Sequence, residues 1–70
     1  MRAITITITE KVEETKLSNF IGNINSGDDV VAIKISDNMV FIAVEGDCAL
    51  GYVEAVAANC FNDYEIENLK

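Results

Sequence analysis

The side chains that could do chemistry in this sequence are few, and they lack their usual partners. Histidine is absent, and the two cysteines, Cys48 and Cys60, are 12 positions apart in a stretch that favours helix. At about 1.5 Å of rise per residue they would lie roughly 18 Å apart, beyond disulfide reach. Because neither a zinc cluster nor a Cys–His nucleophile can be assembled, we expect no metal, no cofactor and two reduced cysteines of the core type.

Two short patterns could still bind an ion or react. Residues 26–29 (Ser-Gly-Asp-Asp) offer oxygen atoms, but they lack the spaced ligands and the distal glutamate of a calcium loop, so they favour a structural turn. Cys48 lies near the start of a predicted helix, a position that can activate a thiol, but the neighbouring Asp47 opposes this effect. Since a Gly-rich phosphate loop is also missing, the residue types predict that the protein is not an enzyme.

Size and charge favour a small binding protein. The chain has 70 residues, with 12 acidic and 5 basic side chains and a formal charge of −7. This charge repels phosphate backbones, so we expect no direct nucleic-acid binding and a basic protein as the partner. The alternative is that acidity only keeps an apolar domain soluble, because half of the residues are hydrophobic.

Length and hydropathy also bound the organisation of the chain. A domain of this size buries a low fraction of its surface and gains stability from self-association. We therefore expect residues 1–70 to form a single α+β domain that forms a homodimer or a higher homo-oligomer. No apolar run approaches the roughly 20 residues of a membrane helix, and Met1–Thr5 alternates like a strand and not like a signal peptide. The sequence predicts a cytoplasmic protein with no membrane partner.

The first third of the chain predicts a strand followed by a helix. Residues 3–9 alternate strictly, which places three isoleucines on one face of the strand. From Thr9 or Glu10 onward the apolar residues recur at helical spacing. Thr9 can cap this helix, and Gly22, with the Asn- and Asp-rich stretch after it, predicts its end.

The middle of the chain predicts a β-hairpin. Two runs rich in β-branched residues, 30–36 and 39–45, are separated by Asp37-Asn38, a pair that tolerates the positive φ of a two-residue turn. A regular hairpin places six β-branched residues on the core face. The expected pairs are Ile35 with Val40, Ile33 with Ile42, and Val31 with Val44.

A second helix and a short last strand complete the expected fold. Gly46-Asp47 can cap a helix over residues 48–60, and residues 64–69 alternate again. The order strand, helix, strand, strand, helix, strand predicts the ferredoxin-like, split βαβ arrangement. In it, both helices cover one face of a four-stranded antiparallel sheet.

Two apolar surfaces are candidate interfaces. Glu54 is the only charged residue between Cys48 and Cys60, so the outer side of the second helix is nearly apolar. Its small side chains leave room for another surface, or they only favour helix formation. The open face of the sheet would also expose large apolar side chains of the hairpin. The candidates are Gly51, Tyr52, Ala55 and Ala58 on the helix, and Met39 and Phe41 on the sheet.

Acidic side chains form a second class of candidates. In the expected topology the last strand lies at a sheet edge, where Glu65 and Glu67 would project from the rim. Such charges prevent unwanted strand pairing, or they imitate a row of phosphates and occupy a basic groove on a nucleic-acid enzyme. The acidic candidates for partner binding are Glu10, Glu13, Glu14, Asp63, Glu65 and Glu67.

Other functions of this topology fit less well. RNA-recognition domains stack bases on aromatic residues in a basic surround, but the expected neighbours of Phe41 include only one basic residue, Lys34, beside Ala43, Thr5, Glu65 and Glu67, so this motif is missing. A small-molecule sensor resembling the ACT-type regulatory domains would carry a ligand motif after its first strand, where this chain has Thr9-Glu10-Lys11. A structural subunit of an oligomer is a third class, favoured by the apolar second helix.

In size, acidity and compact α+β architecture, the chain resembles the phage and mobile-element inhibitors of bacterial defence, especially the anti-CRISPR proteins. The resemblance implies a phage protein that acts in the host bacterial cytoplasm as an inhibitor. It would bind a Cas protein, an effector complex or a nuclease, either by nucleic-acid mimicry or by blocking a conformational step. No individual residue carries over from that group.

Overall fold

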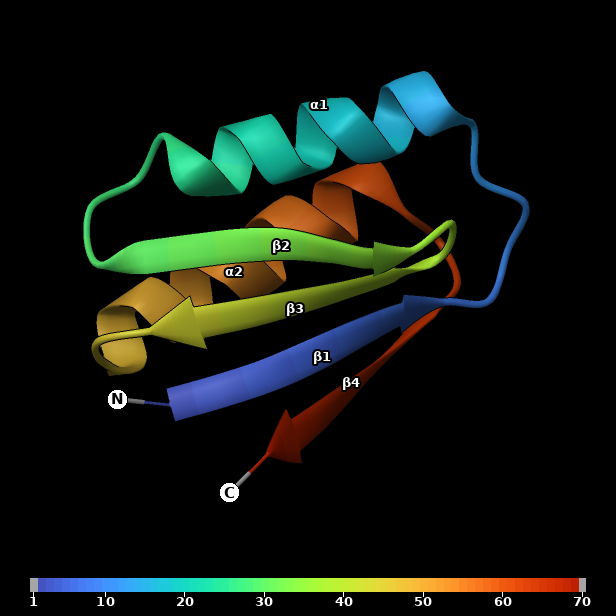
Figure 1. The fold of residues 1–70 in the computed structure, drawn as a ribbon. Coiled ribbons are helices and arrows are strands. Elements are labelled where there is room, and N and C mark those ends of the chain that lie inside the picture. The colour runs from blue at the N-terminus through green and yellow to red at the C-terminus, as the bar shows by residue number, and fades with distance from the viewer. Residues whose placement is uncertain (1, 70) are drawn as a thin grey trace.

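The computed structural model describes residues 2–69, which form a four-stranded antiparallel sheet with two helices on one face (Figure 1). The elements in chain order are β1 (Arg2–Ile8), α1 (Glu14–Asn25), β2 (Val30–Ser36), β3 (Met39–Val44), α2 (Asp47–Cys60) and β4 (Tyr64–Leu69). The strand order is β2-β3-β1-β4, so β2 and β4 are the edge strands. The expected ferredoxin-like βαββαβ arrangement is confirmed.

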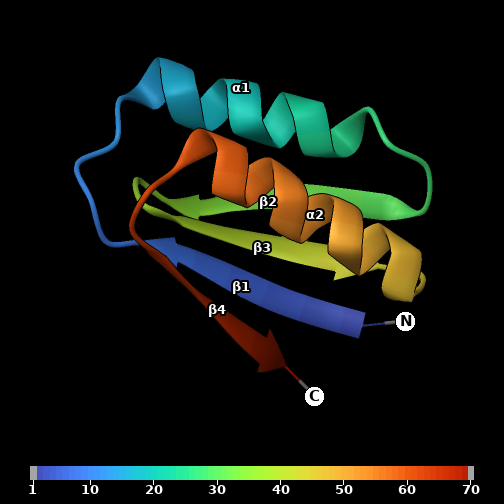
Figure 2. The ribbon, with the colours of Figure 1, turned by 180° about the vertical axis from the view of Figure 1, so that it is seen from behind.

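The core lies between the sheet and the two helices. Ile4, Ile6 and Ile8 of β1 are fully buried, as the alternation predicts. Seen from behind, α1 lies over β2 and α2 lies beside it over β3 (Figure 2). The rings of Phe20 and Phe61 meet edge to face, with centroids 5.2 Å apart. The remaining buried hydrophobic residues are Leu17, Ile24, Val30, Ala32, Val40, Ile42, Val44, Val53 and Ala57.

The start and the end of α1 differ from the sequence-based expectation. The helix begins at Glu14, not at Thr9 or Glu10, because residues 9 and 10 are bound to the loop before β4. The Thr9 amide donates to the Asp63 carbonyl, and the Glu10 carboxylate accepts from backbone amides of that loop. The helix also continues through Gly22 to Asn25, because the buried Ile24 packs its last turn on the core.

The β2–β3 hairpin has a different register from the expected one. Ser36 pairs with Met39 across Asp37-Asn38, but the next pair is Lys34 with Val40, so Ile35 is an extra, bulged residue. The turn residues do not take positive φ: among residues 2–69, Asp29 is the only non-glycine residue that does. A two-residue loop without positive φ mismatches the twist of a hairpin. The bulge accommodates this mismatch.

The bulge reverses the faces of β2, so the predicted burial of its large β-branched residues was wrong. Val31 and Ile33 pair with Ala43 and Phe41 and point away from the helices. The exposed fractions of Val31, Ile33 and Ile35 are 52%, 55% and 53%. The buried residues of β2 are instead Val30 and Ala32, which lie on the helix side under α1, and Lys34 follows them on the same side.

The second helix agrees with the sequence except in two details. Asp47 is its first residue and not its cap, and its carboxylate lies 2.6 Å from the Arg2 guanidinium. Cys60 is partly buried, but Cys48 is exposed, so the expectation that both cysteines are of the core type was wrong for Cys48. Position 48 lies in the first turn of α2, on the side away from the sheet. No helix within residues 2–69 is long and apolar enough to cross a membrane.

Candidate protein-binding face

The sheet surface that faces away from the helices, here called the open sheet face, is divided into two parts. The part formed by β2 and β3 is apolar, with exposed Val31 and Ile33 beside half-buried Phe41. The part formed by β1 and β4 presents threonines and glutamates. By register, the described residues of this face are Ala3, Thr5, Thr7, Val31, Ile33, Ser36, Met39, Phe41, Ala43, Glu65, Glu67 and Leu69, with the bulged Ile35 beside them.

The acidic part of this face lies on β4. Glu65 and Glu67 are exposed and stand opposite Thr7 and Thr5 of β1, at the edge that the sequence predicts. The register places no lysine or arginine on the open sheet face among the described residues. Arg2 and Lys34 both alternate to the other side of the sheet, where Arg2 is paired with Asp47. The open sheet face is therefore apolar at one side and negative at the other.

A side chain of α1 bonds to the outer backbone groups of β2 at Ala32. The Asn25 side-chain amide donates to the Ala32 carbonyl at 3.1 Å, and its oxygen accepts from the Ala32 amide at 2.8 Å. Asn25 thus makes the two bonds that a neighbouring strand would make at this position. Because α1 also packs over β2, this edge is both covered by a helix and partly paired.

The edge of β4 has no such cover. The Thr9 amide bonds to the Asp63 carbonyl, and this fixes the alternation of the β1–β4 ladder. By that alternation, the backbone groups of Tyr64, Ile66 and Asn68 point away from β1. No hydrogen bond found within residues 2–69 uses them. In both views β4 lies at the side of the sheet away from α1 (Figures 1 and 2).

Glu10 has a structural contact, which distinguishes it from the other acidic candidates. One oxygen of its carboxylate accepts from the backbone amides of Asn62 and Asp63, the latter at 2.7 Å. These two bonds, with a smaller contribution from Lys16, lower the pKa of Glu10 below the ordinary value for glutamate. Glu10 therefore fixes the loop that leads into β4.

The other acidic candidates do not form one site. Glu13 and Glu14 lie exposed at the N-terminus of α1, on the helix side of the molecule. Asp63 is exposed in the loop before β4, next to the strand that carries Glu65 and Glu67. Only Asp63, Glu65 and Glu67 belong to the same segment, so the sheet edge is the stronger acidic candidate.

The outer side of α2 is exposed as the sequence predicts, but Tyr52 is not free. Gly51, Ala55 and Ala58 are all exposed along this helix. The Tyr52 hydroxyl donates to the Asn23 carbonyl near the end of α1, at 2.9 Å. A Cβ atom at Gly27 would come within 3.2 Å of the Tyr52 ring, so the loop after α1 passes directly against it. Tyr52 therefore joins the two helices.

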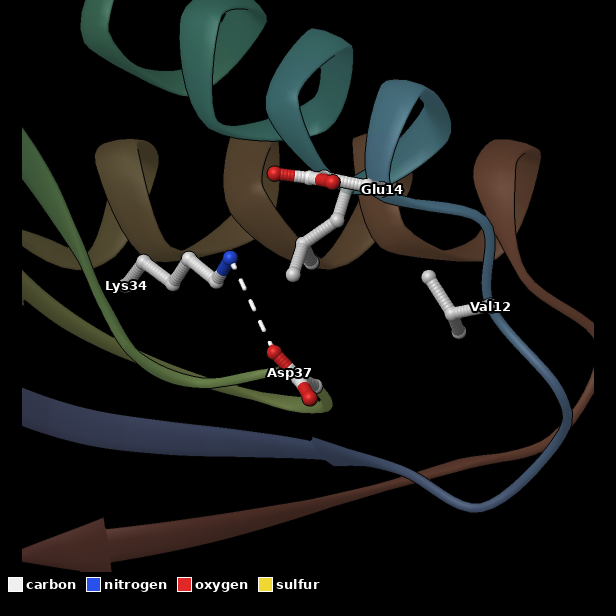
Figure 3. A pocket seen from close by; sticks show the side chains of 5 residues that line it. Val12, Glu14, Lys34 and Asp37 are labelled. Atoms are coloured by element: carbon white, nitrogen blue, oxygen red, sulfur yellow. Dashed lines mark ion pairs between the residues drawn. The ribbon is translucent and has the colours of Figure 1, made fainter.

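A shallow hollow lies between the start of α1 and the β2–β3 turn (Figure 3). Its volume is about 280 Å³, and Val12, Glu14 and Leu17 face Lys34 and Asp37 across it. Lys34 and Asp37 form a long ion pair of 3.9 Å, whose members are both well exposed. The hollow adjoins the segment after β1, where a sensor resembling ACT-type domains would bind its ligand. Its small volume lies just below the usual range of ligand sites.

Sequence reasoning identified Met39, Phe41, Glu65 and Glu67, which the structure brings together on the open sheet face. It missed the three exposed β-branched residues of β2, Val31, Ile33 and Ile35, because a bulge-free hairpin buries them. No pattern in the sequence signals the bulge.

Comparison with known proteins adds no relative to this description. No protein-family model matches the chain, and no curated protein is significantly similar to it.

Proposed function

We propose that this protein is a small acidic protein-binding module that inhibits a nucleic-acid-handling protein of bacterial defence, in the manner of an anti-CRISPR protein. The proposal is supported by the open sheet face, where an apolar part and exposed carboxylates lie on either side of the threonines of β1 and where the described residues include no cation. An apolar patch rimmed by charge is typical of a protein contact. The proposed partner is a Cas protein or nuclease with a basic groove.

Charge supports a basic partner over a nucleic acid or a membrane. The whole chain carries a net charge of −7, and Glu65 and Glu67 place two of its carboxylates on the open sheet face, one strand beyond the apolar part. A basic groove would meet both parts of the face at once. Its apolar floor would cover the β2 and β3 side chains, and its cations would approach β4. Such a contact would compete directly with the nucleic-acid substrate.

The experiment measures the inhibition of purified nucleases and Cas effector complexes at several salt concentrations. For the enzyme that the protein inhibits, we expect weaker inhibition as salt rises, because charge pairs are screened. The double variant Glu65→Lys with Glu67→Lys should lose inhibition. The matched control, Glu13→Lys with Glu14→Lys, changes the net charge equally but lies on the helix side. Equal loss in both double variants would contradict a contact through the open sheet face.

A second candidate function is that of a structural subunit that forms a homo-oligomer through the same face. It is favoured by Val31, Ile33 and Ile35, whose exposure is unusual for side chains of this size and type in one strand. Sedimentation equilibrium at micromolar concentration distinguishes the two functions. A dimer that Ile33→Lys converts to a 7.6 kDa monomer would support the structural subunit.

A further inference from the structure

The two edges of the sheet differ at one position of β2, where the outward backbone groups are already bonded. At β2, the outward amide and carbonyl of Ala32 are both bonded to Asn25. At β4, the outward groups of Tyr64, Ile66 and Asn68 have no partner within the described chain. A row of unpaired amides and carbonyls at the spacing of a strand is a template for one more strand.

We propose that the outer edge of β4 accepts an extended, basic segment of a partner protein, which adds to the sheet as a fifth strand. This inference rests on the proposed function, because it takes the partner to be a basic protein. It adds the mode of binding, which is main-chain pairing, and the sequence type of the bound segment.

The side chains of β4 define that sequence type. On the open side of the sheet, an added strand would lie beside Glu65 and Glu67, which are both exposed. On the helix side it would lie beside Tyr64 and Ile66, which are half-buried against the core. Cross-strand neighbours of opposite charge, and apolar neighbours, stabilise such pairing. The bound segment should therefore alternate lysine or arginine with valine or isoleucine.

The same charges disfavour pairing with a second copy of this chain. Two β4 strands side by side would bring glutamates of one copy next to glutamates of the other, and like charges at neighbouring strand positions destabilise a sheet. The charges on β4 therefore favour pairing with a basic strand and disfavour pairing with β4 of a second copy of this chain.

The experiment uses a synthetic, terminally blocked peptide of about seven residues that alternates lysine and valine, near the usual length of a strand. Hydrogen exchange followed by NMR reports on single amides. We expect saturating peptide to slow the exchange of the Tyr64, Ile66 and Asn68 amides by about tenfold. The amides of β2 should not change. Slower exchange at β2 alone, or no change at β4, would overturn the proposal.

Two matched pairs separate main-chain pairing from simple charge attraction. A peptide with the same charges but with N-methyl groups on alternate residues cannot donate to the sheet, so it should not bind. Asn68→Pro removes one outward amide, whereas Asn68→Ala keeps it, so only the proline variant should weaken peptide binding, by about tenfold. Equal binding in both pairs would overturn strand addition.

The failure of this proposal can be told apart from the failure of the proposed function. If inhibition of a nuclease survives Asn68→Pro but is lost in the double variant Glu65→Lys with Glu67→Lys, the partner is basic and strand addition is wrong. If inhibition survives the double variant, the charge-based function itself is wrong. Dimerisation of the protein alone that Asn68→Pro abolishes would show that the edge serves a second copy, and would also overturn the proposal.

Discussion

β2 and β4 both lie at an edge of the same sheet, but only β2 is partly paired and covered by another element of the described chain. Asn25 bonds to both backbone groups of Ala32, and α1 packs over the strand. Within residues 2–69, no side chain bonds to the outward backbone groups of β4, and this strand carries the exposed Glu65 and Glu67 instead. The bonds at Ala32 occupy that position of β2 against any partner strand, whereas the charges on β4 disfavour only partners of like sign. The β2 edge is therefore protected by structure, whereas the charge of the β4 edge selects which strands could pair with it.

The largest expected effect tests how much the packing of α1 over β2 contributes to stability. Ile24 is fully buried between α1 and the sheet, so Ile24→Ala should lower the free energy of unfolding by about 2–5 kcal/mol. Ile66 of β4 is only half-buried, so Ile66→Ala should cost about half as much. Urea denaturation of both variants measures the two values. Equal costs would mean that β4 is packed as firmly against the core as α1.

The second expected effect concerns the closure of the β2 edge. Asn25→Ala leaves the Ala32 amide and carbonyl without their partner, and should cost about 1–2 kcal/mol. The control is Asn19→Ala, an exposed asparagine of the same helix. The variant should also associate with itself at high concentration, because its edge becomes available beside exposed apolar residues. A strictly monomeric Asn25→Ala protein would show that the packing of α1 alone prevents association at the β2 edge.

The third effect is a pH dependence confined to the β4 side. The folded-state pKa of Glu10 is lowered, so its contribution to stability is present above the pKa of an unfolded glutamate. That contribution is lost as the pH falls through the lowered folded pKa. Acidification below the ordinary glutamate range should therefore lower the protection of the Asn62, Asp63 and β4 amides, relative to their intrinsic exchange rates at the same pH, before it affects β2.

A matched pair of variants checks the origin of this effect. Glu10→Gln removes the titrating carboxylate but keeps an acceptor oxygen, so the difference in thermal stability from the unmodified protein should vanish at low pH. Glu13→Gln changes an exposed glutamate that makes no side-chain cap bond, and serves as the control. If the two variants show the same pH dependence, Glu10 is not the group that fixes this loop.

The smallest expected effect tests the register of β2. Ile33→Thr should change the free energy of unfolding by less than about 0.5 kcal/mol, because Ile33 is 55% exposed. A bulge-free hairpin would bury this side chain, and the same substitution would then destabilise the protein severalfold more. Thermal unfolding of this one variant therefore decides between the two registers.

The alternation of apolar residues predicted the buried face correctly in β1 but not in β2. In β1 only one set of alternate positions carries isoleucine, so its core face was predicted correctly from Ile4, Ile6 and Ile8. In β2 one set carries Val31, Ile33 and Ile35 and the other includes Lys34 and Ser36, so the pattern favoured the first set as the core face, and that choice was wrong. The turn conformation and the packing of α1 decided which set is buried, and neither is local to the strand.

The same reasoning applies to the ends of α1 and to the candidate site. The sequence predicts a cap at Thr9, but Glu10 is bound by amides more than 50 positions further along the chain, which no local pattern reveals. The acidic β4 edge could be predicted, because alternation and topology together place Glu65 and Glu67 there. The pairing of Asn25 with Ala32 could not, since it depends on how closely the helix approaches the strand.

The position of β1 also bears on when the protein can fold during its synthesis. β1 is made first, yet its two neighbours in the sheet are β3 and β4, and Ala3 pairs with Leu69. β1 therefore cannot pair with all of β4 until residue 69 has left the ribosome. Until then the nascent chain exposes an apolar strand that chaperones can recognise, and its final fold forms only after synthesis of β4.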